Sequence, residues 1–183
     1  GGSSMIANAA ALGDVSVTGV SAEYNWCRAG GLLGSSAYLT HNCYASGNVS
    51  LQNSAESVKN VYLGCLIGEQ SGGVVVSGHY SNGAVLRYNG GTQTAKATGS
   101  IPSSWYFDYN KITAHDSVTD AAFASAMNDG ISESGIAETD AYLTSSGKFT
   151  SYTAESLAAM RPAAWQSWGL ADGKVVLGGS QDD

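Results

Sequence analysis

Charged residues are scarce in this sequence, and basic residues are the scarcest. Of its 183 residues only 13% are charged, with 8 Lys and Arg against 15 Asp and Glu, so the formal net charge is −7. A nucleic-acid-binding surface needs clustered cations, whereas these cations are scattered along the chain. The composition therefore argues against nucleic acid as a partner.

Long apolar runs are missing as well. No stretch reaches the roughly 18 consecutive apolar residues of a membrane-spanning helix, so we expect no membrane insertion. The first residues also lack the basic and apolar regions of a secretory leader. The opening Gly-Gly-Ser-Ser-Met resembles the remnant of an expression tag. We interpret residues 1–5 in this way and expect the rest to be covalently part of a larger protein.

Proline and cysteine are also rare, whereas glycine is abundant. There are 2 Pro, 3 Cys and 24 Gly, and this turn-rich composition is not that of a disordered chain. Three cysteines, Cys27, Cys43 and Cys65, cannot form a closed disulfide framework. We favour three buried thiols that pack as small apolar side chains over one disulfide with one free thiol.

A short pattern recurs through the first half of the chain. Gly-x-Val begins at Gly13, Gly47 and Gly83, which gives intervals of 34 and 36 residues. The surrounding segments are short runs rich in Val, Leu and Tyr that end at Gly, Ser or Asn, and such runs predict β-strands. Two to three copies are too few for a closed propeller, whereas a capped solenoid tolerates few copies.

The middle copy carries a family resemblance. Ala-Gly-Gly-Leu-Leu-Gly at 29–34, followed by Asn-Cys-Tyr-Ala-Ser-Gly-Asn-Val-Ser at 42–50, resembles the GLUG repeat of bacterial surface proteins. The next copy departs from the pattern, because Cys65 replaces a glycine and His79 replaces a cysteine. The resemblance implies a right-handed parallel β-helix or a similar solenoid. It also implies export, since the repeat occurs in adhesins, exoproteins and non-catalytic regions of IgA-specific metalloendopeptidases.

The second half has a different pattern. We predict a helix over 116–128 that begins at Asp116 or Ser117 and ends at Gly130. A second helix is predicted over 153–160, and a strand over 174–177. Covering the open sheet edge of a solenoid would prevent end-to-end association, so we interpret this half as a cap.

The predicted fold class is therefore mainly β. A short parallel β-helix or β-solenoid is expected over residues 6–110. A C-terminal mixed α/β cap, or the start of the next module, is expected over 111–183. A β-sandwich is the alternative fold, because the repeat has so few copies.

Aromatic residues supply the candidate ligand-binding positions. Trp105, Tyr106 and Tyr109 form a cluster that could stack on sugar rings or plug the end of a solenoid. Tyr44 and Tyr80 occupy equivalent repeat positions when the copies are aligned at an interval of 36. If they point outward, they form a strip for a glycan or a protein partner; if inward, they belong to the core.

Motifs for catalysis or metal binding are missing. There is no H-E-x-x-H, G-x-S-x-G or P-loop, and no histidine has a partner at metal spacing. We place His41 in a surface turn and His79 at a packed position. We predict no cofactor; the isolated acids Asp14 and Asp140 leave a structural calcium ion as an alternative.

We therefore predict a non-catalytic extracellular or cell-surface module of a bacterial protein, acting in adhesion or as a spacer. Its partner would be a cell-surface or host glycan or a matrix protein. One alternative is a polysaccharide lyase or glycosidase, whose two carboxylates would occupy matching repeat positions. Asp14 aligns with Asn48 and Ala84, so this pair is missing. A second alternative is an accessory region of a large surface protease.

Overall fold

The chain is mainly β, with three helices in the part that the structure describes. The computed structural model describes residues 5–19, 26–36, 39–52, 60–71, 74–88, 91–100, 111–145, 149 and 152–179. Statements below concern these residues. No helix among them has the length and apolar character that a membrane span requires.

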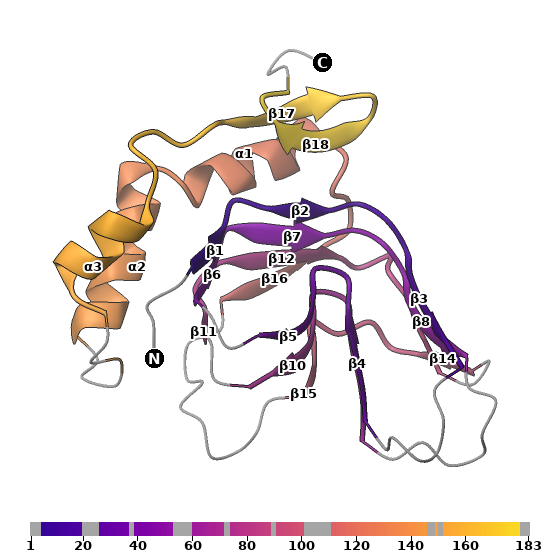
Figure 1. Ribbon diagram of the computed structural model, residues 1–183. Coiled ribbons are helices and arrows are strands. Elements are labelled where there is room, and N and C mark those ends of the chain that lie inside the picture. The colour runs from indigo at the N-terminus through magenta and orange to yellow at the C-terminus, as the bar shows by residue number, and fades with distance from the viewer. Residues whose placement is uncertain are drawn as a thin grey trace.

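Most strands lie in five sheets whose neighbouring strands are mainly parallel (Figure 1). The first sheet contains β1 (Met5–Ala7), β6 (Leu39–His41) and β11 (Val74–Val75). The second contains β2 (Ala10–Ala11), β7 (Cys43–Ala45), β12 (Gly78–Ser81) and β16 (Ile112–His115). The third contains β3 (Val15–Thr18), β8 (Val49–Gln52), β13 (Leu86–Tyr88) and β14 (Gly91–Gln93). The others pair β4 (Cys27–Gly30) with β9 (Val61–Gly64), and β5 (Leu33–Ser36) with β10 (Ile67–Gln70) and β15 (Thr98–Ser100).

In the strand register, most paired residues are 34 positions apart in the sequence. Val15 pairs with Val49, and Cys27 pairs with Val61. In each pair the two residues are 34 positions apart in the sequence. The later intervals vary, from 31 residues between Ile67 and Thr98 to 37 residues between Val49 and Leu86. In each of these sheets the same segment of one stretch therefore lies beside the matching segment of the next.

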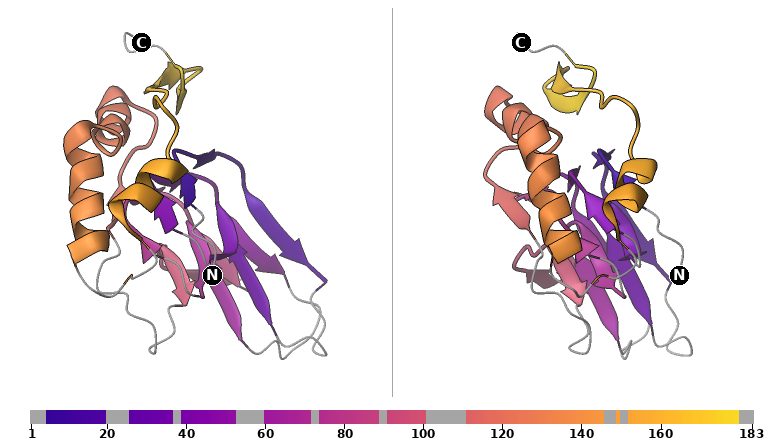
Figure 2. Two further views of the ribbon diagram at one scale, coloured as in Figure 1. Left: turned by 60° about the vertical axis from the view of Figure 1, so that its left-hand side comes forward. Right: turned by 90° about the vertical axis from the view of Figure 1, so that its left-hand side faces the viewer.

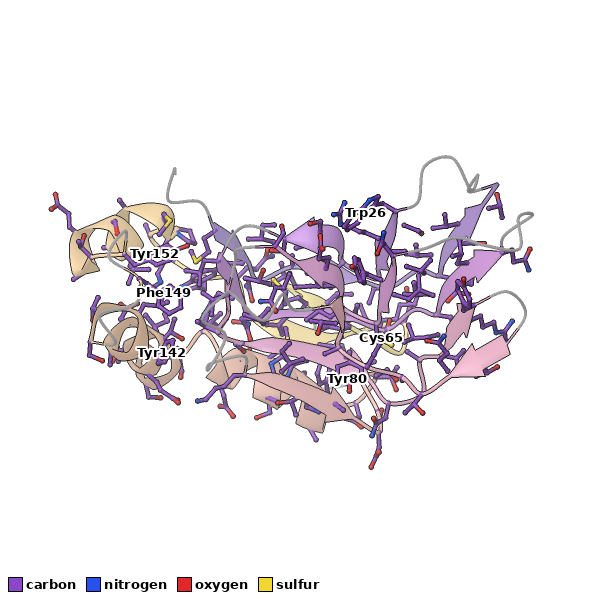
Figure 3. All side chains as sticks on the ribbon, turned by 90° about the horizontal axis from the view of Figure 1, so that it is seen from below. Trp26, Cys65, Tyr80, Tyr142, Phe149 and Tyr152 are labelled. Atoms are coloured by element: carbon purple, nitrogen blue, oxygen red, sulfur yellow. The ribbon has the colours of Figure 1, made fainter. Side chains whose placement is uncertain are left out.

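Small and aliphatic side chains fill the space between the third sheet and the β4–β9 pair. This core contains Cys27, Ala29, Val49, Leu51, Leu63, Cys65, Ala84 and Leu86. Alternation along the strands places these residues inside, because successive side chains point to opposite faces. Figure 3 shows Cys65 within this packed interior. All three cysteines are free and buried, which confirms the prediction of three packed thiols.

Two buried asparagines connect the turns at the end of the first sheet. Asn8 and Asn42 both have positive φ, 52° and 50°, a conformation that asparagine adopts more readily than most residues. The Nδ2 group of Asn42 donates to Asn8 Oδ1 at 2.8 Å and to the Met127 carbonyl at 2.8 Å. The two amides therefore stack across successive turns and attach them to the helical part.

The helical part consists of α1 (Ala121–Asp129), α2 (Glu133–Ser145) and α3 (Ala154–Met160), followed by an antiparallel hairpin of β17 (Trp168–Ala171) and β18 (Lys174–Leu177). The prediction for residues 153–160 is confirmed, with Thr153 as N-cap, and so is the strand over 174–177. The first helix starts later than predicted. Asp120 is its N-cap and accepts from the Phe123 amide, so neither Asp116 nor Ser117 caps it.

The helical part packs on sheet faces, whereas we expected it to cover a sheet edge. One apolar cluster joins Tyr44 of the inner strand β7 to Phe123, Met127, Trp168 and Val175. A second joins the β6 and β11 side chains to α2 and α3, where Tyr142, Phe149 and Tyr152 gather (Figure 3). Figure 2 shows the helices as a layer along one side of the strands. Strand β16, in the segment expected to form the cap, extends the second sheet.

Candidate functional site

Tyr44 and Tyr80, which we expected at equivalent repeat positions, do not lie beside each other. Tyr44 pairs with His79, and Tyr80 pairs with Ala45, so the interval between β7 and β12 is 79 − 44 = 35 rather than 36. A shift of one residue moves a side chain to the opposite face of a sheet. Tyr44 accordingly points toward the helical part, whereas Tyr80 packs against the interior core (Figure 3).

Tyr44 is fully buried and is therefore not part of an exposed strip. Its ring makes edge contacts with Phe123 and Trp168, at centroid distances of 4.9 and 5.6 Å. Its hydroxyl donates to the Val175 carbonyl of the hairpin. Burial raises the pKa of Tyr44 to about 12, so it remains a donor across the physiological range. Tyr44 attaches the hairpin to the sheet.

Trp105, Tyr106 and Tyr109 lie outside the described residues. The structure instead exposes Trp26, whose side chain is 52% accessible at the start of β4. Its ring contacts Tyr62, and the Arg28 guanidinium lies 4.8 Å from the ring centroid. Arg28 also pairs with Glu69 of β10. No sequence pattern selects Trp26, since it lies outside the aligned repeat positions.

Histidines gather where the second sheet meets the helical part. His79 Nδ1 lies 2.9 Å from His115 Nε2, and Ser77 Oγ lies 3.2 Å from His79 Nε2. Phe123 packs on both imidazole rings. His41 is buried and its Nε2 lies 3.0 Å from the Gly130 carbonyl, so our prediction of a surface turn for His41 was wrong.

The environment of these histidines favours their neutral forms. Burial, with a contribution from Arg161, lowers the pKa of His41 to about 4. Burial, with a contribution from His115, lowers the pKa of His79 to about 4. A neutral imidazole has one N–H. The two hydrogen bonds of the chain Ser77–His79–His115 therefore have the same donor-to-acceptor direction, and we call this chain the relay.

A small cavity of about 180 Å³ adjoins this relay. Ser77 and His79 line it from the sheet, and Asp129 and Glu138 line it from α1 and α2. Lys111 also lines it and pairs with Glu138. We call this the histidine cleft. Asp129 and Glu138 give it two carboxylates.

A larger cavity of about 340 Å³ lies between the second sheet and the hairpin. Its polar lining is mostly hydroxyl groups, and we call it the hydroxyl cleft. It is lined by Leu12, Tyr44, Ser46, Ser81, Asp116, Ser117, Val118, Thr119, Gly173 and Lys174. Leu12, Ser46 and Asp116 each directly follow a strand of the second sheet, and Ser81 ends one. The cleft therefore forms where the carboxyl ends of four strands meet.

The opposite wall of the hydroxyl cleft is the turn of the hairpin. Asp172 and Gly173 have φ of 51° and 66°, as the two central residues of a type I′ hairpin turn require. The turn places Lys174 on the cleft. Asp-Gly between apolar runs is a strong hairpin signal, so this wall was within reach of sequence reasoning, although we predicted only its second strand.

Among the described residues, no group of three His, Cys, Asp or Glu side chains is arranged to hold a metal ion. Asp140, considered above for calcium, instead pairs with Arg161 through two hydrogen bonds. Comparison of the chain with protein-family models, with curated proteins and with solved structures finds no match.

Proposed function

We propose that this chain is a short parallel β-solenoid that serves as a non-catalytic module of a larger secreted or cell-surface protein, acting in adhesion or as a spacer. The observation that carries the proposal is the parallel pairing of strands from neighbouring stretches at intervals of 31 to 37 residues, with 34 the commonest. The resemblance of residues 29–50 to the GLUG repeat of bacterial surface proteins supports the same assignment.

Rigid stacking suits a display module. Parallel stacking with a core between the third sheet and β4–β9 gives a stiff support whose outer faces are free to vary. Here one outer face carries the helical part and two clefts. Ligand sites on such scaffolds lie at the ends of regular elements, which hold side chains in place with little loss of entropy on binding.

The proposal is tested by binding of the purified chain to an array of glycans and host-matrix proteins. Selective binding supports adhesion. A folded chain that binds nothing on the array supports a spacer role. Steady release of product from an array glycan would overturn the proposal, because a non-catalytic module leaves its ligand unchanged.

The histidine cleft supports a second candidate, a hydrolase. Asp129 and Glu138 on one wall provide the two carboxylates of a glycosidase, while the Ser77–His79–His115 relay has the order of nucleophile, base and positioning group. Lys111 pairs with Glu138, which ties up one of the carboxylates. We therefore rank this function second.

Chromogenic glycosides and short-chain esters test the second candidate. Turnover that is lost in Glu138→Gln supports a glycosidase, and turnover that is lost in Ser77→Ala supports an esterase. Asp172→Asn is the matched control, because Asp172 is an exposed acid outside this cleft. Equal rates in all variants would exclude a reaction in the histidine cleft.

A further inference from the structure

We propose that the hydroxyl cleft binds an acidic saccharide, with Lys174 binding its carboxylate and Asp116 accepting hydrogen bonds from its ring hydroxyls. This inference rests on the proposed adhesive function and names the class of ligand. It is argued from the charges, the hydroxyl groups and the apolar patch that line one cleft.

Two opposite charges line the cleft without pairing with each other. Lys174 has no acidic partner among the residues that the structure describes, and its side chain is exposed. Asp116 accepts one hydrogen bond, from Asn82 Nδ2 to Oδ1 at 3.2 Å, which leaves Oδ2 for a ligand. A ligand that carries one carboxylate and several hydroxyls satisfies both groups at once.

Hydroxyl groups supply the remaining polar contacts. Ser46 directly follows β7 and Ser81 ends β12, while Ser117 and Thr119 follow β16. Ser81 Oγ already accepts from the Gly83 amide, and Ser117 Oγ and Thr119 Oγ1 hydrogen-bond to each other, so these hydroxyls offer a ligand their remaining capacity. A hydroxyl donates one hydrogen bond and accepts two, so it can match the mixed donors and acceptors of a sugar. A small dicarboxylate or an amino acid would leave most of these hydroxyls without a ligand partner.

The cleft also offers an apolar patch. Leu12, which is 37% exposed, and Val118, which belongs to the same apolar cluster as Tyr44, both line the cleft. Sugar rings have C–H faces that pack on such surfaces, while their hydroxyls point to the rim. Charged, hydroxyl and apolar groups are thus combined in one concave surface, the usual composition of a small-molecule site.

Both walls of the cleft are held in place before a ligand binds. The floor is a parallel sheet, and the hairpin wall is attached through the Tyr44 hydroxyl to the Val175 carbonyl. The volume of about 340 Å³ is at the lower end of the range for ligand sites, so it suits a single sugar unit of a longer chain. The net charge of −7 disfavours an anion only at long range. At physiological salt, charges farther away than about 8 Å are largely screened, so Lys174 dominates locally.

Titration calorimetry with acidic oligosaccharides tests the assignment. The probes are oligogalacturonides, glucuronate disaccharides and sialyllactose, each beside its methyl ester, which removes only the charge. Lys174→Met is expected to weaken binding of the acid forms about tenfold or more, and Asp116→Asn several-fold. Lys96→Met is the matched control, since Lys96 is an exposed lysine that lines another cavity, and it should leave binding unchanged. Thermal unfolding establishes that each variant is folded.

Three outcomes would overturn the assignment. They are unchanged affinity in folded Lys174→Met, equally tight binding of the methyl esters, and no binding of any acidic probe. If the cleft variants bind array ligands as tightly as the unaltered protein does, the hydroxyl cleft is not the binding site, but the adhesive function still stands. Cleavage of a probe would instead count against the non-catalytic function itself.

Discussion

Asn42 shows how one buried side chain can connect three parts of a molecule. Its amide donates to Asn8 in the preceding turn and to the Met127 carbonyl at the end of α1, both at 2.8 Å. Its backbone lies in the left-handed region with φ of 50°. Because water cannot replace these bonds in a buried site, their loss deprives the Met127 carbonyl of this donor, while Asn8 Oδ1 still accepts from Trp168 Nε1.

We expect Asn42→Ala to lower the free energy of unfolding by about 2–4 kcal/mol, from the two lost hydrogen bonds, one of which leaves the Met127 carbonyl without this donor, and from the cost of positive φ for alanine. Urea denaturation measures the difference. Asn82→Ala is the control, because Asn82 is exposed, and it should cost less than about 0.5 kcal/mol. Similar losses in both variants would contradict a structural role for the asparagine pair.

The buried histidines predict a pH-dependent stability. The pKa of His41 and that of His79 are each lowered to about 4 in the folded protein, whereas an unfolded histidine titrates near 6.5. Between these values the unfolded chain binds more protons than the folded chain. The free energy of unfolding should therefore be constant above about pH 6.5, fall as the pH drops toward 4, and level off below.

For His41 alone this loss is on the order of 3 kcal/mol, because each pKa unit corresponds to about 1.4 kcal/mol. His41→Gln and His79→Gln should each flatten the dependence. NMR titration of the imidazole protons measures the midpoints directly. Ordinary midpoints near 6.5 in the folded protein would contradict the burial of these rings.

At the scale of elements, close approach between strands restricts certain positions to glycine. A Cβ added at Gly68 would lie 2.5 Å from the Gly34 carbonyl oxygen and 2.7 Å from the Ala29 nitrogen. Both atoms belong to the backbone and cannot move aside without shifting a strand. The sheets of β4 and β5 can approach β10 only because this side chain is missing.

Gly68→Ala should therefore lower the free energy of unfolding by about 1–3 kcal/mol or more, since 1–3 kcal/mol is the usual cost of overpacking. Gly13→Ala is the matched control, because a Cβ there has no neighbour within 4 Å. Thermal unfolding compares the two. A Gly68→Ala protein as stable as Gly13→Ala would mean that β4, β5 and β10 are farther apart than described.

Sequence patterns predicted the strand-rich first half, α3 and β18, because each has a local signal such as a cap or a short β-branched run. They did not predict α2, whose buried side chains are only Thr139 and Leu143, so no apolar stripe marks it. The start of α1 was misplaced because Asp116, Ser117 and Asp120 are all capable N-caps. Only tertiary packing selects Asp120 among them.

The candidate site was harder to predict than the fold. A difference of one residue in the repeat interval, 35 instead of 36, places Tyr44 and Tyr80 on opposite faces of the second sheet. The hydroxyl cleft combines residues from four strand ends with a hairpin more than 50 positions later, as Lys174 and Asp116 show. No sequence pattern indicates that Ser, Asp and Lys residues so far apart in the chain line one cleft.

At the scale of the whole molecule, the strand register predicts which residues lie close enough to be joined by a disulfide. Ser16 pairs with Ser50, and Ser50 pairs with Arg87 on the next strand. Neighbouring strands lie about 4.8 Å apart, so Ser16 and Arg87 are about twice as far from each other. Only adjacent positions are close enough for a disulfide.

The double variant Ser16→Cys with Ser50→Cys should form a disulfide under mild oxidation, whereas Ser16→Cys with Arg87→Cys should not. Mass spectrometry of peptides from the oxidised protein identifies the bond. The native thiols are buried, and burial raises the pKa of Cys43 to about 12, so they should not compete. Comparable yields in both variants would contradict the parallel register.

The contact of Asn8 with Gln166 and Trp168 has a consequence for synthesis. Trp168 Nε1 donates to Asn8 Oδ1, and Asn8 Nδ2 donates to the Gln166 carbonyl. These hydrogen bonds join positions about 160 residues apart in the sequence. Contacts this distant in sequence form late and slow folding. A chain that emerges from a ribosome with its N-terminus first keeps its earliest turn incomplete until almost the whole chain has followed.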